Sequence, residues 1–220
     1  TVRAMGEAVV DALANVHLVD WQAAGLGDFG RPDGFLQRQV PRWRSQYERH
    51  QVREIPMFDT VAEWLQANCP PGGAPAVLHS DFRIDNCLMD PVRPDRVAGI
   101  IDWEMATIGD PLLDLASFLG FWGNDRPDAL AMPLLQGVTR VPGAPSRAEL
   151  ADRYAAATGR SVEHLDYYMA LAFWKLGAII EGAYANHVHG TLNSPEYARD
   201  LEPGVPALFA EAARFAGIAG

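Results

Sequence analysis

The chain carries the stretch VLHSDFRIDN at residues 77–86, and a second apolar run that ends in carboxylates, IIDWE, follows at residues 100–104. In the first stretch Asp81 precedes Asn86 by five positions, and Asp102 ends the apolar part of the second. One carboxylate can act as a base, and the other two side chains offer oxygen ligands that suit Mg²⁺. These are the parts that phosphoryl transfer requires, so the pattern predicts a phosphoryl-transfer centre.

A β-hairpin is predicted between these two groups of polar residues. The short apolar runs 87–89 and 97–101 flank the segment DPVRPDR at residues 90–96. Pro, Asp and Asn are common in turns, whereas short apolar runs bounded by such residues are typical of strands. We therefore expect two antiparallel strands whose turn is centred near Pro94.

That turn position fixes an expected register. Leu88 would face Ile100, and Asn86 would face Asp102. Directly opposed residues have Cβ atoms roughly 4.5–5.5 Å apart, which is close enough for an amide oxygen and a carboxylate to share one cation. The predicted register thus gives Asn86 and Asp102 a common metal.

Asp81 precedes the hairpin in a polar loop. A carboxylate there can accept the proton of a substrate hydroxyl while that oxygen attacks the terminal phosphate of ATP. Arg83, two residues on, can hold phosphate oxygens with its forked guanidinium. The competing interpretation is ordinary turn chemistry, because Asp and Asn are favoured in turns. The coincidence of Asp81, Asn86 and Asp102 with three required roles favours catalysis.

Together with GDPLLDLA at residues 109–116, these motifs resemble the aminoglycoside phosphotransferase family, which shares the protein-kinase-like fold. One branch, the phosphotransferases related to those fused to acyl-CoA dehydrogenases, is resembled by HLVD at 17–20, GLGDFGRP at 25–32 and RQVPRW at 38–43. The resemblance implies that ATP is the co-substrate, that Asp81 is the catalytic base, and that Asn86 and Asp102 bind Mg²⁺. Ser80 stands where many relatives have Gly.

The resemblance also implies an amino-terminal lobe that covers the adenine and carries a phosphate-binding lysine. No Gly-rich loop in a strand-turn-strand setting precedes His79, and Lys175 is the only lysine of the 220 residues. We therefore expect residues 1–220 to form the carboxyl-terminal lobe of a kinase-like enzyme, with the missing lobe of the same enzyme as its partner. The expected fold class is mainly α with a small β-hairpin, an α+β lobe.

Apolar residues at helical spacing predict the helices of this lobe. Asp110 as N-cap and Pro111 at the first helical position predict a helix over residues 111–121. The segment 125–145, which is rich in Pro and Gly, is expected to be mostly irregular. The other helices are expected at residues 2–17, 33–50, 56–67, 147–158, 162–188 and 195–216.

The composition of the chain argues against several classes of binding partner. The net charge of −10 argues against nucleic acid, because phosphate backbones require clustered Lys and Arg. The longest apolar stretch, residues 167–180, is shorter than the ~20 residues of a membrane span, so no membrane partner is expected. Cys69 and Cys87 lie 18 positions apart, which suggests neither a disulfide framework nor a zinc site, and a cytoplasmic location is the default.

Several residues admit two interpretations. Asp114 either reaches the backbone of the Asp81 loop, as the resemblance implies, or only favours the dipole of its helix. His79 is expected to be a buried, hydrogen-bonded scaffold residue, because Asp81 already serves as base. For contact with the acceptor substrate the candidates are Trp103 and Glu104, which follow the metal aspartate, and Glu181 and His187, although aromatic residues around these last two also suit a helix core.

The sequence thus predicts an O-phosphotransferase that acts on a hydroxyl of a small molecule. One alternative is a non-catalytic kinase-like module that binds a ligand or a partner. Another is a hydrolase with a two-carboxylate metal site, because Asp102 and Glu104 would share one face of a strand. The resemblance allows an aminoglycoside, a choline-like amino alcohol, a homoserine-like acid or a hydroxyacyl-CoA as acceptor.

Overall fold

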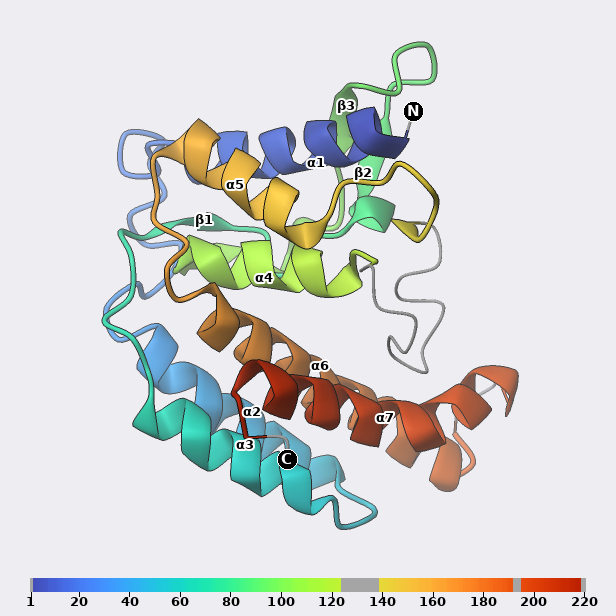
Figure 1. Cartoon of the computed structure of the whole chain (residues 1–220). Helices are drawn as coiled ribbons and strands as arrows, with labels where there is room; N and C mark the ends of the chain where they lie inside the picture. The colour runs from blue at the N-terminus through green and yellow to red at the C-terminus, as the bar shows by residue number, and fades with distance from the viewer. Residues whose placement is uncertain (1, 124–138, 192–194, 219–220) are drawn as a thin grey trace. The chain divides into compact units, whose positions relative to one another are not determined.

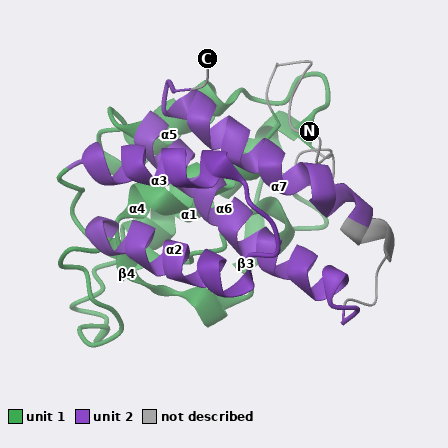
Figure 2. Cartoon of the chain, turned by 90° about the horizontal axis from the view of Figure 1, so that it is seen from below, with its two compact units in different colours: residues 1–35, 71–127, 134–165 green, residues 36–70, 128–133, 166–220 purple. Residues whose placement is uncertain are grey.

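The computed structural model describes residues 2–123, 139–191 and 195–218, without the side chains of 195–198. The chain divides into two compact units (Figure 2). Unit 1 comprises residues 1–35, 71–127 and 134–165, and unit 2 comprises residues 36–70, 128–133 and 166–220. Of the predicted irregular segment 125–145, the part up to residue 138 lies outside the described residues.

Two helices of unit 1 pack against each other, α1 (Val2–His17) and α5 (Arg147–Thr158) (Figure 1). A capping box begins α5: the Glu149 amide donates to the Ser146 hydroxyl, and the Ser146 amide donates to the Glu149 carboxylate. The Ser146 amide and the Arg3 guanidinium lower the pKa of Glu149 to about 2. Both helices match the predicted ranges.

The described residues of unit 1 form two small sheets, whereas one was predicted. The additional sheet pairs β1 (Ala76–Leu78) with β4 (Thr107–Gly109) in antiparallel fashion, with Val77 opposite Ile108. The sequence did not predict β4, because only three residues of this strand pair and because their partner strand, β1, lies about 30 positions upstream. Directly after β4, helix α4 (Pro111–Phe121) runs as predicted.

The second sheet is the predicted hairpin of β2 (Cys87–Met89) and β3 (Val97–Ile100). The tip that joins them is closed on itself, since Asp90 Oδ1 accepts hydrogen bonds from the amides of Val92 and Arg93 at 2.9 and 3.0 Å. These bonds lower the pKa of Asp90, because they stabilise the ionised carboxylate.

Unit 2 is helical throughout its described elements. They are the short 3₁₀ helix Leu36–Arg38, α2 (Gln39–His50), α3 (Pro56–Ala67), α6 (Leu165–Val188) and α7 (Pro195–Phe215). The predicted helix 33–50 therefore begins later than expected, and the predicted helix 162–188 begins at Leu165. The remaining predicted helices agree to within a residue at each end.

The core of unit 2 is built around a stack of aromatic rings. The Phe58 ring lies 3.8 Å from that of Tyr47 and 4.9 Å from that of Trp174. The indole of Trp174 also donates to the Phe58 carbonyl at 3.0 Å. Trp174 and the aromatic rings in contact with it thus belong to the core.

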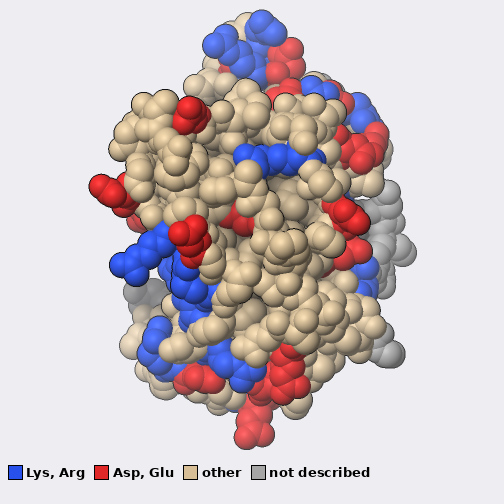
Figure 3. Space-filling model, turned by 90° about the vertical axis from the view of Figure 1, so that its left-hand side faces the viewer, with Lys and Arg blue, Asp and Glu red and all other residues tan. Residues whose placement is uncertain are grey.

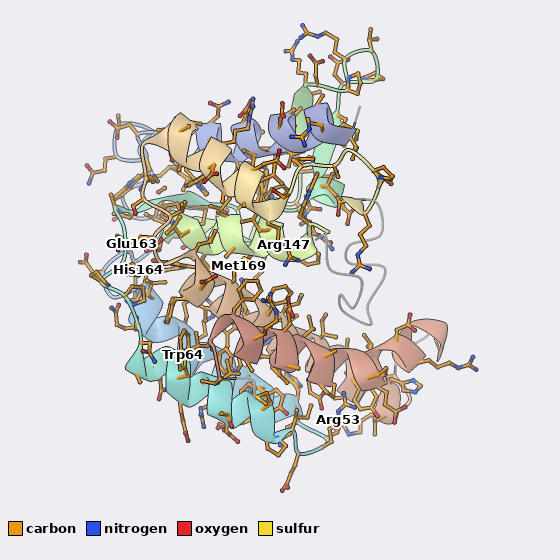
Figure 4. All side chains as sticks on the ribbon, in the orientation of Figure 1. Arg53, Trp64, Arg147, Glu163, His164 and Met169 are labelled. Carbon is orange, nitrogen blue, oxygen red and sulfur yellow. The ribbon has the colours of Figure 1, made fainter. Side chains whose placement is uncertain are left out.

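Arg53, in the loop between α2 and α3, ties that loop to two helices of unit 2 (Figure 4). Its guanidinium forms an ion pair with Glu181 at 3.1 Å and lies 3.9 Å from the Tyr184 ring. It also donates to the carbonyls of Leu201 and Glu202 in α7. The Arg53 side chain thereby connects the loop to both α6 and α7.

The described elements confirm a mainly α fold with small sheets. Among the described helices, none combines the length and the hydropathy that crossing a membrane requires. On the face that Figure 3 shows, acidic and basic side chains are interspersed with uncharged surface. The net charge of the whole sequence is −10.

Candidate active site

The loop after β1 is held by a carboxylate from another helix. Asp114, in the first turn of α4, is buried and accepts the His79 amide at 2.6 Å and the Ser80 amide at 2.9 Å. The interpretation in which Asp114 reaches the loop backbone is therefore confirmed. A buried carboxylate needs several hydrogen-bond donors, and the two loop amides supply them to Asp114. The same two bonds fix the backbone of the loop.

A second carboxylate of the same helix holds the entry to β1. Asp110 caps α4 by accepting the Leu112 amide at 3.1 Å, as predicted, and it also accepts the Gly73 amide at 2.8 Å. The segment from Gly73 to Ser80 is thus fixed at both ends by the first turn of α4. These bonds add to the pairing of β1 with β4.

Ser80 adopts the left-handed region, with φ of 68°. This conformation suits glycine and costs an ordinary residue roughly 1–2 kcal/mol. The bonds from its own amide and the preceding one to Asp114 maintain it. The turn at Ser80 directs the chain into the Asp81 loop.

His79 is the scaffold residue that the sequence predicted. Its ring is fully buried, and the Asp81 amide donates to Nδ1 at 3.3 Å, while Nε2 lies 2.8 Å from the Ile101 carbonyl. Since an acceptor is needed on Nδ1, we assign the ring hydrogen to Nε2. His79 thus joins the Asp81 loop to the end of β3.

Asp81 is in contact with two other predicted site residues. Asn86 Nδ2 donates to the Asp81 carbonyl at 2.8 Å and to Asp81 Oδ2 at 3.1 Å. Arg83 Nε lies 3.6 Å from the same Oδ2, and its guanidinium lies 5.6 Å from the Phe121 ring centre. Because the Asn86 amide nitrogen is used in these bonds, its Oδ1 is the atom suited to binding a cation.

The predicted register of the hairpin is wrong by one residue. Cys87, and not Leu88, pairs with Ile100, and the Ile101 amide donates to the Asn86 carbonyl at 3.0 Å. At the tip Met89 pairs with Val97, which centres the turn on Arg93 and not on Pro94, and an irregularity between Leu88 and Met89 offsets only part of this difference. Asn86 is therefore opposite Ile101 and not opposite Asp102.

Asp102 also leaves the strand. Its backbone is left-handed, with φ of 68° and ψ of 55°, and the 3₁₀ helix Trp103–Met105 follows at once. The left-handed residue changes the direction of the chain directly after β3. Asp102 and Glu104 therefore do not lie on one face of a strand, which removes the geometric basis of the predicted two-carboxylate hydrolase site.

Two acceptor candidates lie beside this turn. The Trp103 ring lies 4.8 Å from the ring of His79, and its indole donates to the Ile100 carbonyl at 2.9 Å. Trp103 is partly exposed, and Glu104 is exposed. Contact of these two side chains with an acceptor remains a prediction.

The other two acceptor candidates belong to unit 2. Glu181 is fully buried and paired with Arg53, and burial raises the pKa of its carboxyl above the ordinary value. His187 is exposed near the end of α6, with its ring 6.4 Å from that of Tyr184. A role of Glu181 or His187 in binding the acceptor stays a prediction.

The sequence patterns did not identify two buried residues behind the loop, His17 and Tyr154. His17 lies 3.5 Å from Asp114 Oδ2 through Nε2, and its Nδ1 lies 2.7 Å from the hydroxyl of Tyr154. The available signal was a single histidine at the end of an amphipathic helix, in the HLVD string. Such a residue is indistinguishable by pattern from a helix C-terminal histidine that only complements the helix dipole.

Cys87 follows Asn86 at the start of β2 and is buried. Burial, with a smaller contribution from the charge of Asp85, raises the pKa of its thiol to about 12. A thiol that stays protonated at neutral pH is a poor nucleophile. Cys87 therefore acts as a small apolar strand residue, as predicted.

Comparison with known proteins shows which family the chain is similar to. A model of the phosphotransferase enzyme family matches residues 1–158. Acyl-CoA dehydrogenase family member 11 of Gallus gallus is 34% identical over 205 residues, which cover 88% of this chain and 26% of that protein. The probable acyl-CoA dehydrogenase IBR3 of Arabidopsis thaliana is 33% identical over 210 residues, which cover 90% of this chain and 25% of that protein.

Two solved structures share the fold. A protein of Ralstonia eutropha, provisionally described as an aminoglycoside phosphotransferase, superposes with a TM-score of 0.83 at 28% identity, covering 97% of this chain and 65% of the other. A macrolide 2′-phosphotransferase type I gives 0.61 at 22% identity, covering 91% and 58%. The chain spans about a quarter of the length of the curated relatives that it matches. These likenesses confirm the family and the branch that the motifs indicated.

Proposed function

The chain belongs to the phosphotransferase enzyme family, and from this premise we propose that it carries the catalytic loop of an ATP- and Mg²⁺-dependent O-phosphotransferase acting on a small-molecule hydroxyl. The observation that supports the proposal most is the contact of Asn86 and Arg83 with Asp81 Oδ2. Three residues with distinct roles in phosphoryl transfer thereby meet around one carboxylate.

In the proposed reaction the hydroxyl oxygen of the acceptor attacks the terminal phosphate of ATP. Asp81 accepts the proton that this hydroxyl loses. The bond from Asn86 Nδ2 holds the carboxylate in place, and the Asp81 amide is fixed through His79. Arg83, with one nitrogen close to Asp81, presents its other N–H groups to phosphate oxygens. A base held in this way lowers the reorganisation that the reaction requires.

The donor chemistry of two residues fits a hard cation. Asn86 offers Oδ1, and Asp102 offers a carboxylate immediately after β3. When bound, Mg²⁺ would neutralise charge on the phosphates of ATP. We assign Asn86 and Asp102 to this role, with Trp103 and Glu104 proposed to border the acceptor.

A nucleotide-covering lobe completes the proposal. In kinases the phosphates are also held by a lysine and a Gly-rich loop of another lobe. We propose that residues 1–220 form the carboxyl-terminal lobe and that a second lobe of the same protein supplies those groups. The names of the relatives favour a hydroxyacyl-CoA as the first acceptor to test, ahead of an aminoglycoside, a choline-like amino alcohol and a homoserine-like acid.

The direct test is ADP release by the complete gene product that contains these residues, measured with each of the four acceptor classes and with Mg²⁺ present or chelated. Release that depends on one acceptor and on Mg²⁺ is expected. Mg-ATP binding without ADP release in any condition would instead favour the non-catalytic kinase-like module. A release rate that is independent of every acceptor would indicate hydrolysis and overturn the transferase proposal.

A further inference from the structure

A chain of buried polar contacts in unit 1 leads from α5 to the Asp81 loop. Tyr154, on α5, has its hydroxyl 2.7 Å from His17 Nδ1. His17 ends α1, and its Nε2 lies 3.5 Å from Asp114 Oδ2. Asp114 accepts the amides of His79 and Ser80. Three helices and one loop are therefore linked by two contacts in series and by two parallel hydrogen bonds to Asp114.

All three side chains of this chain of contacts are out of solvent. Tyr154 is fully buried, and His17 and Asp114 are each exposed by 1%. In such surroundings a polar atom without a suitable partner destabilises the fold, so the orientation of each hydrogen matters. A hydrogen on the nitrogen of His17 that lies nearest Asp114 would point towards that carboxyl group.

The hydroxyl of Tyr154 faces the other nitrogen of the His17 ring. Burial raises the pKa of Tyr154 above its ordinary value, so the hydroxyl keeps its hydrogen at neutral pH. A hydroxyl that donates to Nδ1 leaves the ring hydrogen of neutral His17 on Nε2, which faces Asp114. The distance of 3.5 Å is longer than a usual hydrogen bond, so the contact orients the carboxylate mainly by electrostatics.

We propose that Tyr154 and His17 are positioning residues for the catalytic loop: Tyr154 sets the tautomer of His17, and His17 orients the Asp114 carboxylate that holds the His79 and Ser80 amides. The inference rests on the proposed function only in that the loop carries Asp81. The contacts themselves are independent of any reaction. A role in positioning also explains a buried histidine that makes no contact with the proposed reacting groups.

The first test is nitrogen NMR of the His17 ring in the wild type and in Tyr154→Phe, which removes only the hydroxyl. The wild-type ring should carry its hydrogen on Nε2 alone, and Tyr154→Phe should shift it to a mixture of both tautomers. The matched control is Tyr167→Phe, which removes another buried hydroxyl, bonded to the Leu65 carbonyl in unit 2. A wild-type ring protonated on Nδ1, or an unchanged ring in Tyr154→Phe, would overturn the proposal.

Amide hydrogen exchange at His79 and Ser80 supplies the second readout. A lost contact of 0.5–1.5 kcal/mol corresponds to about two- to tenfold faster exchange, beyond any change in the rest of unit 1. Tyr154→Phe and His17→Leu should show it. His17→Gln should retain slow exchange, because its amide NH₂ can occupy the place of Nε2. Equal exchange at these two amides in His17→Leu and His17→Gln would contradict the orienting role.

Turnover separates this inference from the proposed function. In the complete gene product, Tyr154→Phe should lower kcat by about two- to tenfold and leave KM for ATP unchanged, because the loop is loosened while the nucleotide contacts stay. A wild type without turnover would refute the proposed function and leave the NMR results intact. Normal turnover with unchanged NMR spectra in Tyr154→Phe would refute the positioning role alone.

Discussion

Arg53 donates through Nη1 to the carbonyl of Glu202 at 2.7 Å, and this is the oxygen that Pro206 leaves without a helical donor. In an α-helix the amide four residues later would bond that carbonyl, but proline has no amide hydrogen. Helix α7 continues through Pro206 to Phe215. An arginine from a distant loop thus replaces the missing bond within unit 2.

Arg53→Ala should therefore reduce the free energy of unfolding by about 2–4 kcal/mol, because it leaves the buried Glu181 carboxylate and the Glu202 carbonyl without this donor. Urea denaturation measures the loss. The control is Arg153→Ala, whose ion pair with Asp11 is solvent-exposed and should cost only ~0–1 kcal/mol. Equal losses in the two variants would contradict the role of Arg53.

The pH dependence of stability should carry a signature of Glu181. Burial raises the pKa of its carboxyl above the ordinary value of 4.5, although Arg53 opposes the rise. The folded protein then binds this proton more tightly, so the contribution of Glu181 is fully present below pH 4.5 and is lost as the pH rises through the raised pKa. The free energy of unfolding of the wild type minus that of Glu181→Gln should therefore decrease as the pH rises from 4.5 through the raised pKa.

Glu149 provides the control with the opposite sign. Its pKa is lowered to about 2 from an ordinary value of 4.5, so its contribution is present above pH 4.5 and is lost as the pH falls towards 2. Glu149→Gln keeps an acceptor for the Ser146 amide and removes only the charge. The stability difference between wild type and Glu149→Gln should shrink on acidification. If the stability difference between wild type and Glu181→Gln also shrinks on acidification, the raised pKa of Glu181 is contradicted.

Asp81→Asn should lower kcat of the complete gene product by about 10²–10⁴-fold and leave KM for ATP nearly unchanged, because an amide cannot accept the hydroxyl proton. Steady-state ADP release measures both constants. Asp85→Asn is the matched control, since that carboxylate lies in the same loop but its side chain is 68% exposed. Near-normal turnover in Asp81→Asn would refute its assignment as the base.

Asp102→Asn should weaken Mg-ATP binding while the melting temperature stays within a few degrees of the wild type. Asparagine tolerates the left-handed backbone of Asp102, whereas alanine would add strain, so the asparagine variant isolates the loss of charge. Calorimetric titration of the complete gene product with Mg-ATP measures the affinity. Asp95→Asn, at the exposed hairpin tip, should bind Mg-ATP normally. Unchanged affinity in Asp102→Asn would exclude the metal role.

Ser80→Gly should raise the stability by up to about 1 kcal/mol, because it relieves the left-handed strain of roughly 1–2 kcal/mol at a smaller cost in chain entropy. Ser80→Ala serves as the comparison, since it keeps the Cβ atom that causes the strain. Thermal unfolding should therefore rank the glycine variant above the alanine variant. The reverse order would mean that the turn at Ser80 is held in a different way.

The helices were predictable because their evidence is local. Asp110 and Pro111 mark the start of α4, and Ser146 with Glu149 lies at the start of α5. The hairpin itself was predictable for the same reason. Its register was not, because several turn residues separate the strands and do not show that the turn is centred on Arg93 or that an irregularity follows Leu88.

The site was predictable in its residue types and less so in its contacts. The residue types and the spacing of Asp81 and Asn86 predicted a base and a metal ligand, whereas the hydrogen bond between the two side chains was not predicted. The contacts of Asp114 and His17 join residues far apart in the sequence, and no local pattern encodes them. Only the packing of α1, α4 and β1 brings these groups together.

The closed tip of the β2–β3 hairpin has a practical consequence. Asp90 satisfies the amides of Val92 and Arg93 within the tip, and Val92 is 86% exposed. The carboxylates that fix the Asp81 loop come from α4, so an inserted peptide or a fluorophore at Val92 leaves those anchors untouched. Residue 92 is therefore a suitable attachment point for labelling or immobilising the protein while its chemistry is measured.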